Sequence, residues 1–235
     1  MKILLKAMVI FVVVLLPLQA VPIVNNTFTG QEILNSPDAS FPNVVQPSLD
    51  GTSLRFDNPV NNDILLDFDI LQSGQVLAEG STVTAVVNVS QNFGDFDPSF
   101  GFIDGSGTSA GFQVANNSGG RGSIGGTGLG LTTVFNNAGL PGTFDITLSV
   151  STNGGVSTAS LAFGTGSGNL NLAVPLDLET GLSFFLVGNG GDTSPYLINS
   201  LNVTVDGNPI PEPTTYLSLL IGMLFCGFVV RKRKK

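Results

Sequence analysis

A strict alternation of apolar and polar residues constrains the fold of this chain more than any other feature. From Thr143 to Val150, Phe144, Ile146, Leu148 and Val150 fall on one face and the polar residues on the other. This two-residue period is typical of a β-strand with one buried face. Residues 64–71, 81–90 and 201–205 alternate similarly, and residues 21–210 show no convincing helical period. The pattern predicts an all-β body over residues 21–208.

Turn signals separate the alternating segments. Asn153-Gly154-Gly155 stands before the next apolar run, residues 156–163, and predicts a hairpin because these residues readily adopt positive φ. Many short strands with frequent turns indicate a single antiparallel β-sandwich of the jelly-roll or concanavalin-like type. We expect residues 21–50, which contain several prolines, to be mostly irregular, and the Gly-rich residues 105–130 to form long loops between short strands.

Composition excludes several classes of function. The chain of 235 residues has no histidine and a single cysteine, Cys226. This excludes His-based acid/base catalysis, His or multi-Cys zinc sites and an internal disulfide. Residues 21–210 hold sixteen acidic residues against two basic ones, Arg55 and Arg121, a net charge of −14. Such a charge excludes nucleic acid as a partner.

The N-terminus has the pattern of a secretory signal peptide over residues 1–20. Lys2 and Lys6 precede an apolar run over residues 7–16, and Ala20 supplies a small residue for cleavage. The alternatives are a short buried helix and an uncleaved anchor. We expect the secretion machinery to export the body through the inner membrane.

The C-terminus predicts a transmembrane helix over residues 214–230, a segment without charges. Seventeen helical residues span about 25 Å, slightly less than a hydrocarbon core of about 30 Å, and slight thinning of the bilayer closes the gap. The cluster Arg231, Lys232, Arg233, Lys234 and Lys235 follows, and the positive-inside rule places it in the cytoplasm. A GPI signal normally lacks such a basic cluster, and a plain membrane anchor is the simpler alternative.

A stiff linker, residues 209–213, precedes this helix and ends in Pro211, Glu212 and Pro213. The tripeptide, the apolar helix and the basic terminus together resemble the PEP-CTERM sorting signal. This signal occurs in exported proteins of Gram-negative bacteria, many of which make extracellular polysaccharide. The resemblance implies recognition by an exosortase-type membrane protease, processing near Pro211–Pro213, and transfer of the body to the cell surface, extracellular matrix or biofilm. It covers residues 211–235 and implies nothing about the body.

Candidate chemistry within the body is sparse. Residues 120–125 fit the G-x-G-x-x-G pattern of dinucleotide sites, but the glycine-rich segment behind them will not begin a helix. Asp67 and Asp69 share one face of a predicted strand, as a carboxylate pair in a glycosidase would, yet the glutamates are scattered. Two solvated carboxylates are the favoured interpretation, so no catalytic residue is predicted.

Calcium is the best-supported candidate ligand. Asp95 and Asp97 fall in a predicted loop and Asp104 lies near them in sequence; loop aspartates suit this hard cation. Surface aspartates that form local hydrogen bonds in a turn are the alternative.

Together these features predict an exported, non-enzymatic surface or extracellular-matrix protein with polysaccharide as the expected ligand. The scarcity of glutamate and the absence of histidine argue against catalysis. Two alternatives remain: a secreted hydrolase that acts on polysaccharide, and an adhesin anchored permanently in the membrane.

Overall fold

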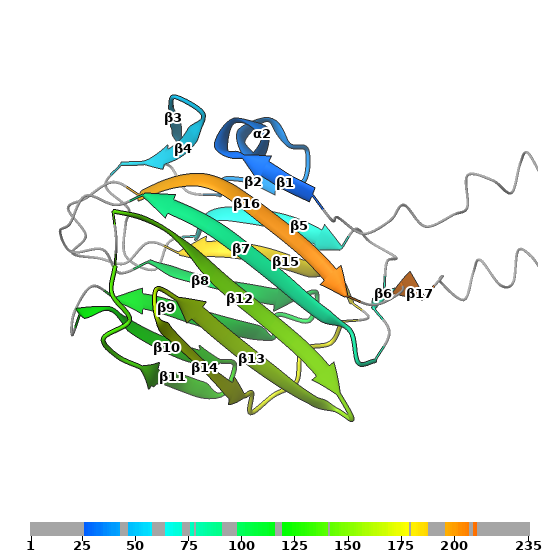
Figure 1. The fold of residues 1–235 in the computed structure, drawn as a ribbon. Helices are drawn as coiled ribbons and strands as arrows, with labels where there is room; N and C mark the ends of the chain where they lie inside the picture. The colour runs from blue at the N-terminus through cyan, green and yellow to red at the C-terminus, as the bar shows by residue number, and fades with distance from the viewer. Residues whose placement is uncertain are drawn as a thin grey trace, which may run out of the picture.

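Two antiparallel β-sheets packed face to face make up the body (Figure 1). The computed structural model describes residues 26–42, 47–57, 64–71, 76–77, 79–90, 98–115, 119–140, 142–178, 180–187, 196–206 and 209–210. The two sheets confirm the all-β sandwich that the alternating pattern predicts. The segments predicted as a signal peptide and as a C-terminal span lie outside the described residues. Within those residues, no helix has the length and apolar character needed to cross a membrane.

The first sheet has eight strands. In order across the sheet these are β14 (Gly166–Asn171), β13 (Val156–Phe163), β12 (Thr143–Asn153), β7 (Thr82–Ser90), β16 (Tyr196–Asp206), β4 (Ser53–Phe56) and β3 (Ser48–Asp50), with β1 (Asn26–Thr29) also paired to β16. Since Asn26 pairs with Val203, the beginning of β1 and the later part of β16 lie together at one end of the sandwich.

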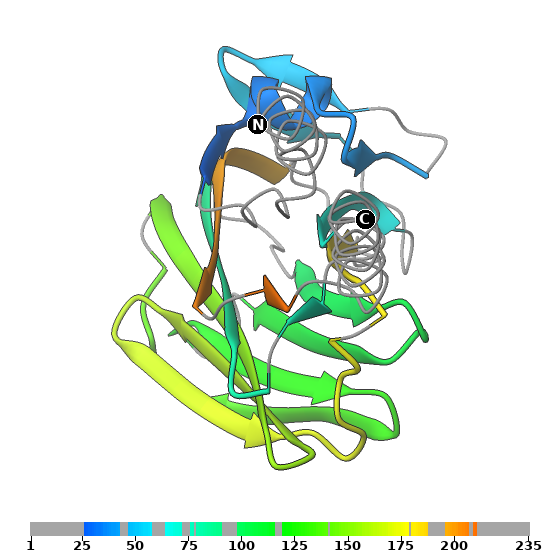
Figure 2. The ribbon, with the colours of Figure 1, turned by 90° about the vertical axis from the view of Figure 1, so that its right-hand side faces the viewer.

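The second sheet has seven strands, which lie behind the first in Figure 1. In order across the sheet they are β11 (Leu129–Phe135), β10 (Arg121–Gly126), β9 (Ser109–Ala115), β8 (Ser99–Asp104), β15 (Leu182–Val187), β5 (Ile64–Leu71) and β2 (Ala39–Ser40). A small third sheet pairs β6 (Val76–Leu77) with β17 (Pro209–Ile210). Figure 2 shows the two large sheets from the side, with their inner faces towards each other.

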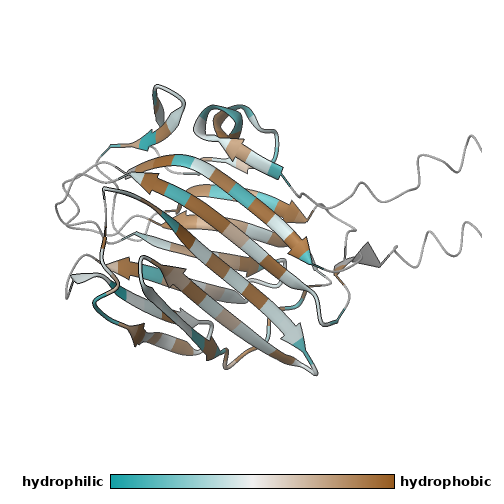
Figure 3. Cartoon of the chain, viewed as in Figure 1, coloured by the Kyte–Doolittle hydropathy of each residue, from teal (hydrophilic) through white to brown (hydrophobic). Residues whose placement is uncertain are grey.

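The core lies between the two sheets because every second residue of their strands points inward. On β12 the predicted inward residues Phe144, Ile146, Leu148 and Val150 are all buried, and β7 alternates in the same way. The second sheet contributes stacked and edge-on phenylalanines, with the rings of Phe102 and Phe112 at 6.0 Å. Figure 3 shows the resulting alternation of hydropathy along the strands.

The predicted hairpin after β12 is present. Asn153 pairs with Val156, and Gly154 and Gly155 between them have φ values of 60° and 72°. Positive φ at both central residues is the type I′ geometry that matches the twist of two antiparallel strands. The carboxylate of Glu79 also accepts a hydrogen bond from the backbone N–H of Gly154 at 2.6 Å.

The expectation that residues 21–50 are mostly irregular is wrong for much of that segment. It contains β1, β2 and β3, and a short helix, α2 (Gly30–Asn35). The physical reason is a capping box: the hydroxyl of Thr29 accepts from the N–H of Glu32, and the Glu32 carboxylate accepts from the N–H of Thr29. This reciprocal pair satisfies two donors at the beginning of the helix.

The expectation of long loops in the Gly-rich residues 105–130 is also wrong, because β9, β10 and the first part of β11 occupy most of that segment. Several glycines of this sheet leave room for a neighbouring ring. Phe135 occupies the space that a Cβ of Gly122 would need, and Phe185 does the same at Gly101. In these strands glycine lets a neighbouring ring pack close to the backbone. Treating glycine only as a turn residue therefore predicts loops here that are in fact strands.

One residue of β5 faces the wrong way relative to the simple alternation. The alternation over residues 64–71 predicts that Ile64 points inward together with Leu66, but 42% of Ile64 is exposed, whereas its neighbour Leu65 is buried. The register between β5 and β15 shifts between the pairs of Leu186 and Val187, which marks an irregularity at this end of the strand. Such a shift reverses the side-chain pattern locally.

Candidate functional site

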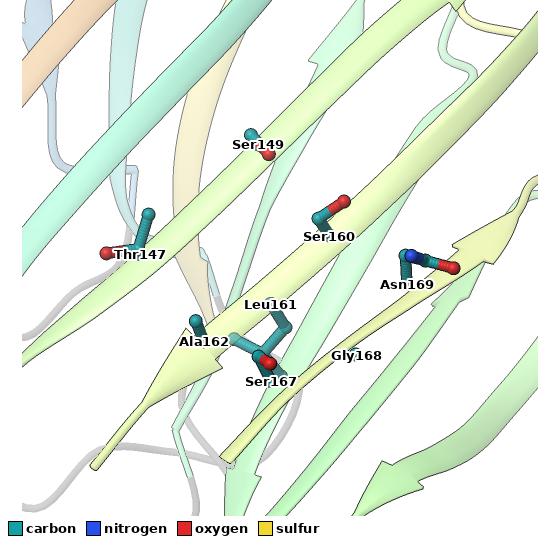
Figure 4. Close-up of a pocket in the computed structure, with 8 residues that line it drawn as sticks. All are labelled: Thr147, Ser149, Ser160, Leu161, Ala162, Ser167, Gly168 and Asn169. Atoms are coloured by element: carbon teal, nitrogen blue, oxygen red, sulfur yellow. The ribbon is translucent and has the colours of Figure 1, made fainter. Parts of the chain in front are cut away.

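A shallow hollow lies on the outer face of the eight-stranded sheet, over β12, β13 and β14 (Figure 4). Its volume is about 270 Å³. It is lined by Thr147, Ser149, Ser160, Leu161, Ala162, Ser167, Gly168 and Asn169. The lining is therefore made mostly of small hydroxyl and amide side chains, and it carries no charge.

The strand register places these side chains in rows that cross the sheet. Ser149 on β12 lies opposite Ser160 on β13, which lies opposite Asn169 on β14. The adjacent row runs from Thr147 through Ala162 to Ser167. All six alternate with inward-facing residues of their strands and therefore point outward. Three neighbouring strands thus build one polar surface from segments that the sequence separates by turns.

The polar side chains of this hollow have no hydrogen-bond partner among the described residues. This holds for Thr147, Ser149, Ser160, Ser167 and Asn169. Other polar side chains on the same face are paired: Asn88 donates to Asp145 at 2.6 Å. Thr158 donates to Asn171 at 2.9 Å. The hollow is therefore a place where hydroxyl and amide groups stay available for a ligand.

Asp67 and Asp69 lie where the sequence placed them, on the outer face of β5 in the second sheet. Asp69 accepts a hydrogen bond from the hydroxyl of Ser183 at 2.8 Å. Asp67 is half-buried, and its Oδ1 atom is buried without a hydrogen-bond partner. Burial raises the pKa of Asp67, the charge of Asp69 raises it further, and Ser183 opposes this effect.

This acidic pair is separate from the hollow. The hollow lies on the outer face of one sheet and the pair on the outer face of the other, so the core lies between them. A glycosidase needs both carboxyl groups beside the same glycosidic bond. A ligand in the hollow would not reach the acidic pair.

Asp104 has a structural role at the end of β8. Its Oδ1 atom accepts from the N–H groups of Ser106 and Thr108 at 2.9 and 2.8 Å, and from the Ser106 hydroxyl at 2.6 Å. Its Oδ2 atom accepts from the N–H of Asp177 at 2.7 Å. Burial alone would raise the pKa of Asp104, but these hydrogen bonds outweigh it and hold the pKa below its ordinary value.

The calcium site stays a prediction, and these bonds concern only one of its three residues. Because the carboxylate of Asp104 is committed to four hydrogen-bond donors, it is a poor candidate for a cation ligand. Asp95 and Asp97 lie outside the described residues. Within the part of the chain that the structure describes, no group of three or more His, Cys, Asp or Glu side chains is placed to hold a metal ion.

The remaining predicted sites are the G-x-G-x-x-G segment and the sorting signals at the two termini. The G-x-G-x-x-G segment, residues 120–125, runs into β10 and is followed by a turn and β11, so the helix that a dinucleotide site requires is missing here. Ala20, the Pro211–Pro213 tripeptide and the basic cluster Arg231–Lys235 lie outside the described residues.

No protein-family model and no curated protein matches this chain. Solved structures share its fold at low identity. A legume lectin-like domain from Entamoeba histolytica matches with a TM-score of 0.52 and 8% identity, over 79% of this chain and 99% of that domain. The GH43 BlXynB protein from Bacillus licheniformis matches with a TM-score of 0.51 and 10% identity, over 76% of this chain and 39% of that one.

A third match is the Bacteroides ovatus protein described as Xyloglucan PUL GH43B, with a TM-score of 0.50 and 13% identity, over 76% of this chain and 38% of that one. This chain therefore spans well under half the length of either GH43 protein. At such identities the likeness shows a common β-sandwich fold and nothing about activity.

Proposed function

We propose that this chain is an exported, non-enzymatic surface or extracellular-matrix protein that binds neutral polysaccharide in the hollow over β12, β13 and β14. The observation that carries this proposal is the set of unpaired hydroxyl and amide groups in the hollow. Sugars offer the matching donors and acceptors. Lectin-like and GH43 structures among the fold neighbours support a carbohydrate ligand.

Charge narrows the class of polysaccharide. With a net charge of −14 over residues 21–210, the body repels an anionic polymer. The lining of the hollow offers no cation to offset that repulsion. An uncharged glycan meets neither difficulty, and it pairs with neutral hydrogen-bonding groups without desolvating a charge.

Affinity electrophoresis in gels that contain a neutral glucan, such as dextran, or a polyuronate, such as alginate, tests this proposal. We expect the protein to be retarded by the neutral polymer alone. Ser160→Ala and Asn169→Ala should each weaken binding roughly three- to tenfold, the equivalent of about one hydrogen bond. Thr132→Ala, an exposed hydroxyl on the other sheet, is the matched control. Unchanged retardation of both hollow variants would contradict the proposed site.

The hydrolase alternative is tested by release of reducing sugar from the same polymers. We expect no product, because the acidic pair and the hollow lie on opposite faces. Product that disappears in the Asp67→Asn variant, while binding persists, would assign catalysis to the acidic pair.

We further propose, from the resemblance of residues 211–235 to a PEP-CTERM signal, that the membrane anchor is transient and that an exosortase-type enzyme processes it. The intact mass of the protein from its native host tests this. A mass without residues 1–20 and without Arg231–Lys235 supports processing at both ends. A surface protein that retains the basic cluster would instead be a permanent adhesin.

A further inference from the structure

Among the described residues, the two large sheets end in five edge strands, and four of them are poorly suited to pairing with another chain. β1 has only four residues and leads directly into α2. β11 is irregular, because its register with β10 shifts twice. β3 has three residues and includes Asp50, which forms an ion pair with Arg55 at 3.4 Å. β2 has two residues. Bulges, charges and short length are the usual means by which proteins protect a sheet edge.

The fifth edge, β14, has none of these protections. Its six residues pair with β13 in unbroken register from Gly166 to Asn171. The strand has no proline and no charged residue. Its exposed and half-buried residues alternate regularly, with Ser167, Asn169 and Asn171 exposed. A regular uncharged edge of this kind leaves a row of backbone N–H and C=O groups available over about 20 Å.

Charge restricts which partner can approach this edge. Between residues 146 and 176, which include most of β12 and all of β13 and β14, there is no charged residue, although the body as a whole has a net charge of −14. Two copies of the body therefore repel each other except where they meet at this uncharged region. A basic partner would be drawn to the acidic parts instead. The favoured occupant of the β14 edge is a second copy of the same chain.

We propose that two copies of this protein pair through their β14 strands, antiparallel about a two-fold axis, so that their eight-stranded sheets become one continuous sheet. Such a contact is self-complementary, as a two-fold interface must be. Ser167, Gly168 and Asn169 of each copy also line the hollow. The pairing brings two hollows next to each other on one face, which suits a polymeric ligand. Because six-residue edges bury little area, the pairing is weak and concentration-dependent.

Sedimentation velocity of the full chain in detergent, without sugar, tests this pairing over a range of concentrations. We expect the dimer fraction to rise with concentration in the wild type. Asn169→Lys should abolish the dimer, since the two-fold axis brings the two introduced charges close together. Thr132→Lys adds the same charge to the β11 edge and should leave the dimer intact. Circular dichroism establishes that both variants keep the β fold.

Cross-linking gives a second measurement that does not depend on a destabilising variant. In a Cys226→Ser background, Asn169→Cys should form a disulfide-linked dimer under mild oxidation, and Thr132→Cys should not. A wild type that remains monomeric at every concentration would overturn the proposal, as would equal behaviour of the two lysine variants. Because no sugar is present, these outcomes are independent of whether the hollow binds polysaccharide.

Discussion

Asp104 shows how a single carboxylate can fix two distant segments of this sandwich. It accepts hydrogen bonds within the turn after β8 and one from the N–H of Asp177, more than seventy residues further on. Its side chain is buried, with 4% exposed. A buried carboxylate that accepts four hydrogen bonds stabilises the fold through them mainly while it remains ionised.

The Asp104→Asn variant should therefore lower the free energy of unfolding by about 2 kcal/mol near neutral pH. Since folding lowers the pKa of Asp104, its contribution is present above the ordinary aspartate value of about 3.9 and is lost as pH falls through the folded pKa. Urea unfolding at several pH values checks this. The wild type should lose more stability on acidification than the Asp104→Asn variant, with the exposed Asp206→Asn as the control. Parallel pH profiles would contradict this role.

For single residues, the sequence predicted which face of a strand most side chains occupy, but not which side chains become neighbours across strands. Alternation alone placed the hydroxyls of Thr147 and Ser149 on the outer face of their strand. It could not place Asn169 in the same row, because that depends on the register of β13 with its two neighbours. Unpaired hydrogen-bonding groups in the hollow became recognisable only once all three strands were in place.

Among the elements, the β12–β13 hairpin was the most predictable, because Asn-Gly-Gly specifies its turn within three residues. Strands built around glycine were the least predictable. The rings of Phe185 and Phe135 fill the space that a side chain at Gly101 or Gly122 would need, so these strand positions require glycine. Both rings come from later strands, β15 and β11. Composition therefore predicted loops where packing produces strands.

A valine at position 155 should destabilise the hairpin. Gly155 has a φ of 72° and open space around its Cα, so the cost of Gly155→Val is conformational, about 1 to 2 kcal/mol in unfolding free energy. Gly111→Val is the matched control, because an added Cβ at Gly111 also meets open space but Gly111 does not need positive φ. Thermal unfolding should show a clear loss for the first variant and little change for the second. Equal effects would mean that backbone conformation does not control this turn.

At the scale of the whole molecule, charged residues are distributed unevenly over the sandwich. Residues 122–176, which form most of β10 and all of β11 to β14, contain a single charged residue, Asp145, and occupy the lower part of the sandwich in Figure 1. All other acidic residues of the body lie outside this segment. The uneven distribution of charge is visible in the sequence. Only the fold shows that these uncharged strands lie together at one end of the sandwich. That end carries both the hollow and the unprotected β14 edge.

If this uncharged end binds a neutral polysaccharide as we propose, hydrogen bonds without charged contacts should hold the ligand. The dependence of affinity on salt tests this expectation most directly, because screening weakens contacts between charges and leaves neutral hydrogen bonds largely unchanged. Isothermal titration calorimetry with a soluble neutral glucan, repeated from low to high NaCl concentration, should give a nearly constant Kd. A Kd that rises steeply with salt, or binding that appears only with a charged polymer, would contradict the account.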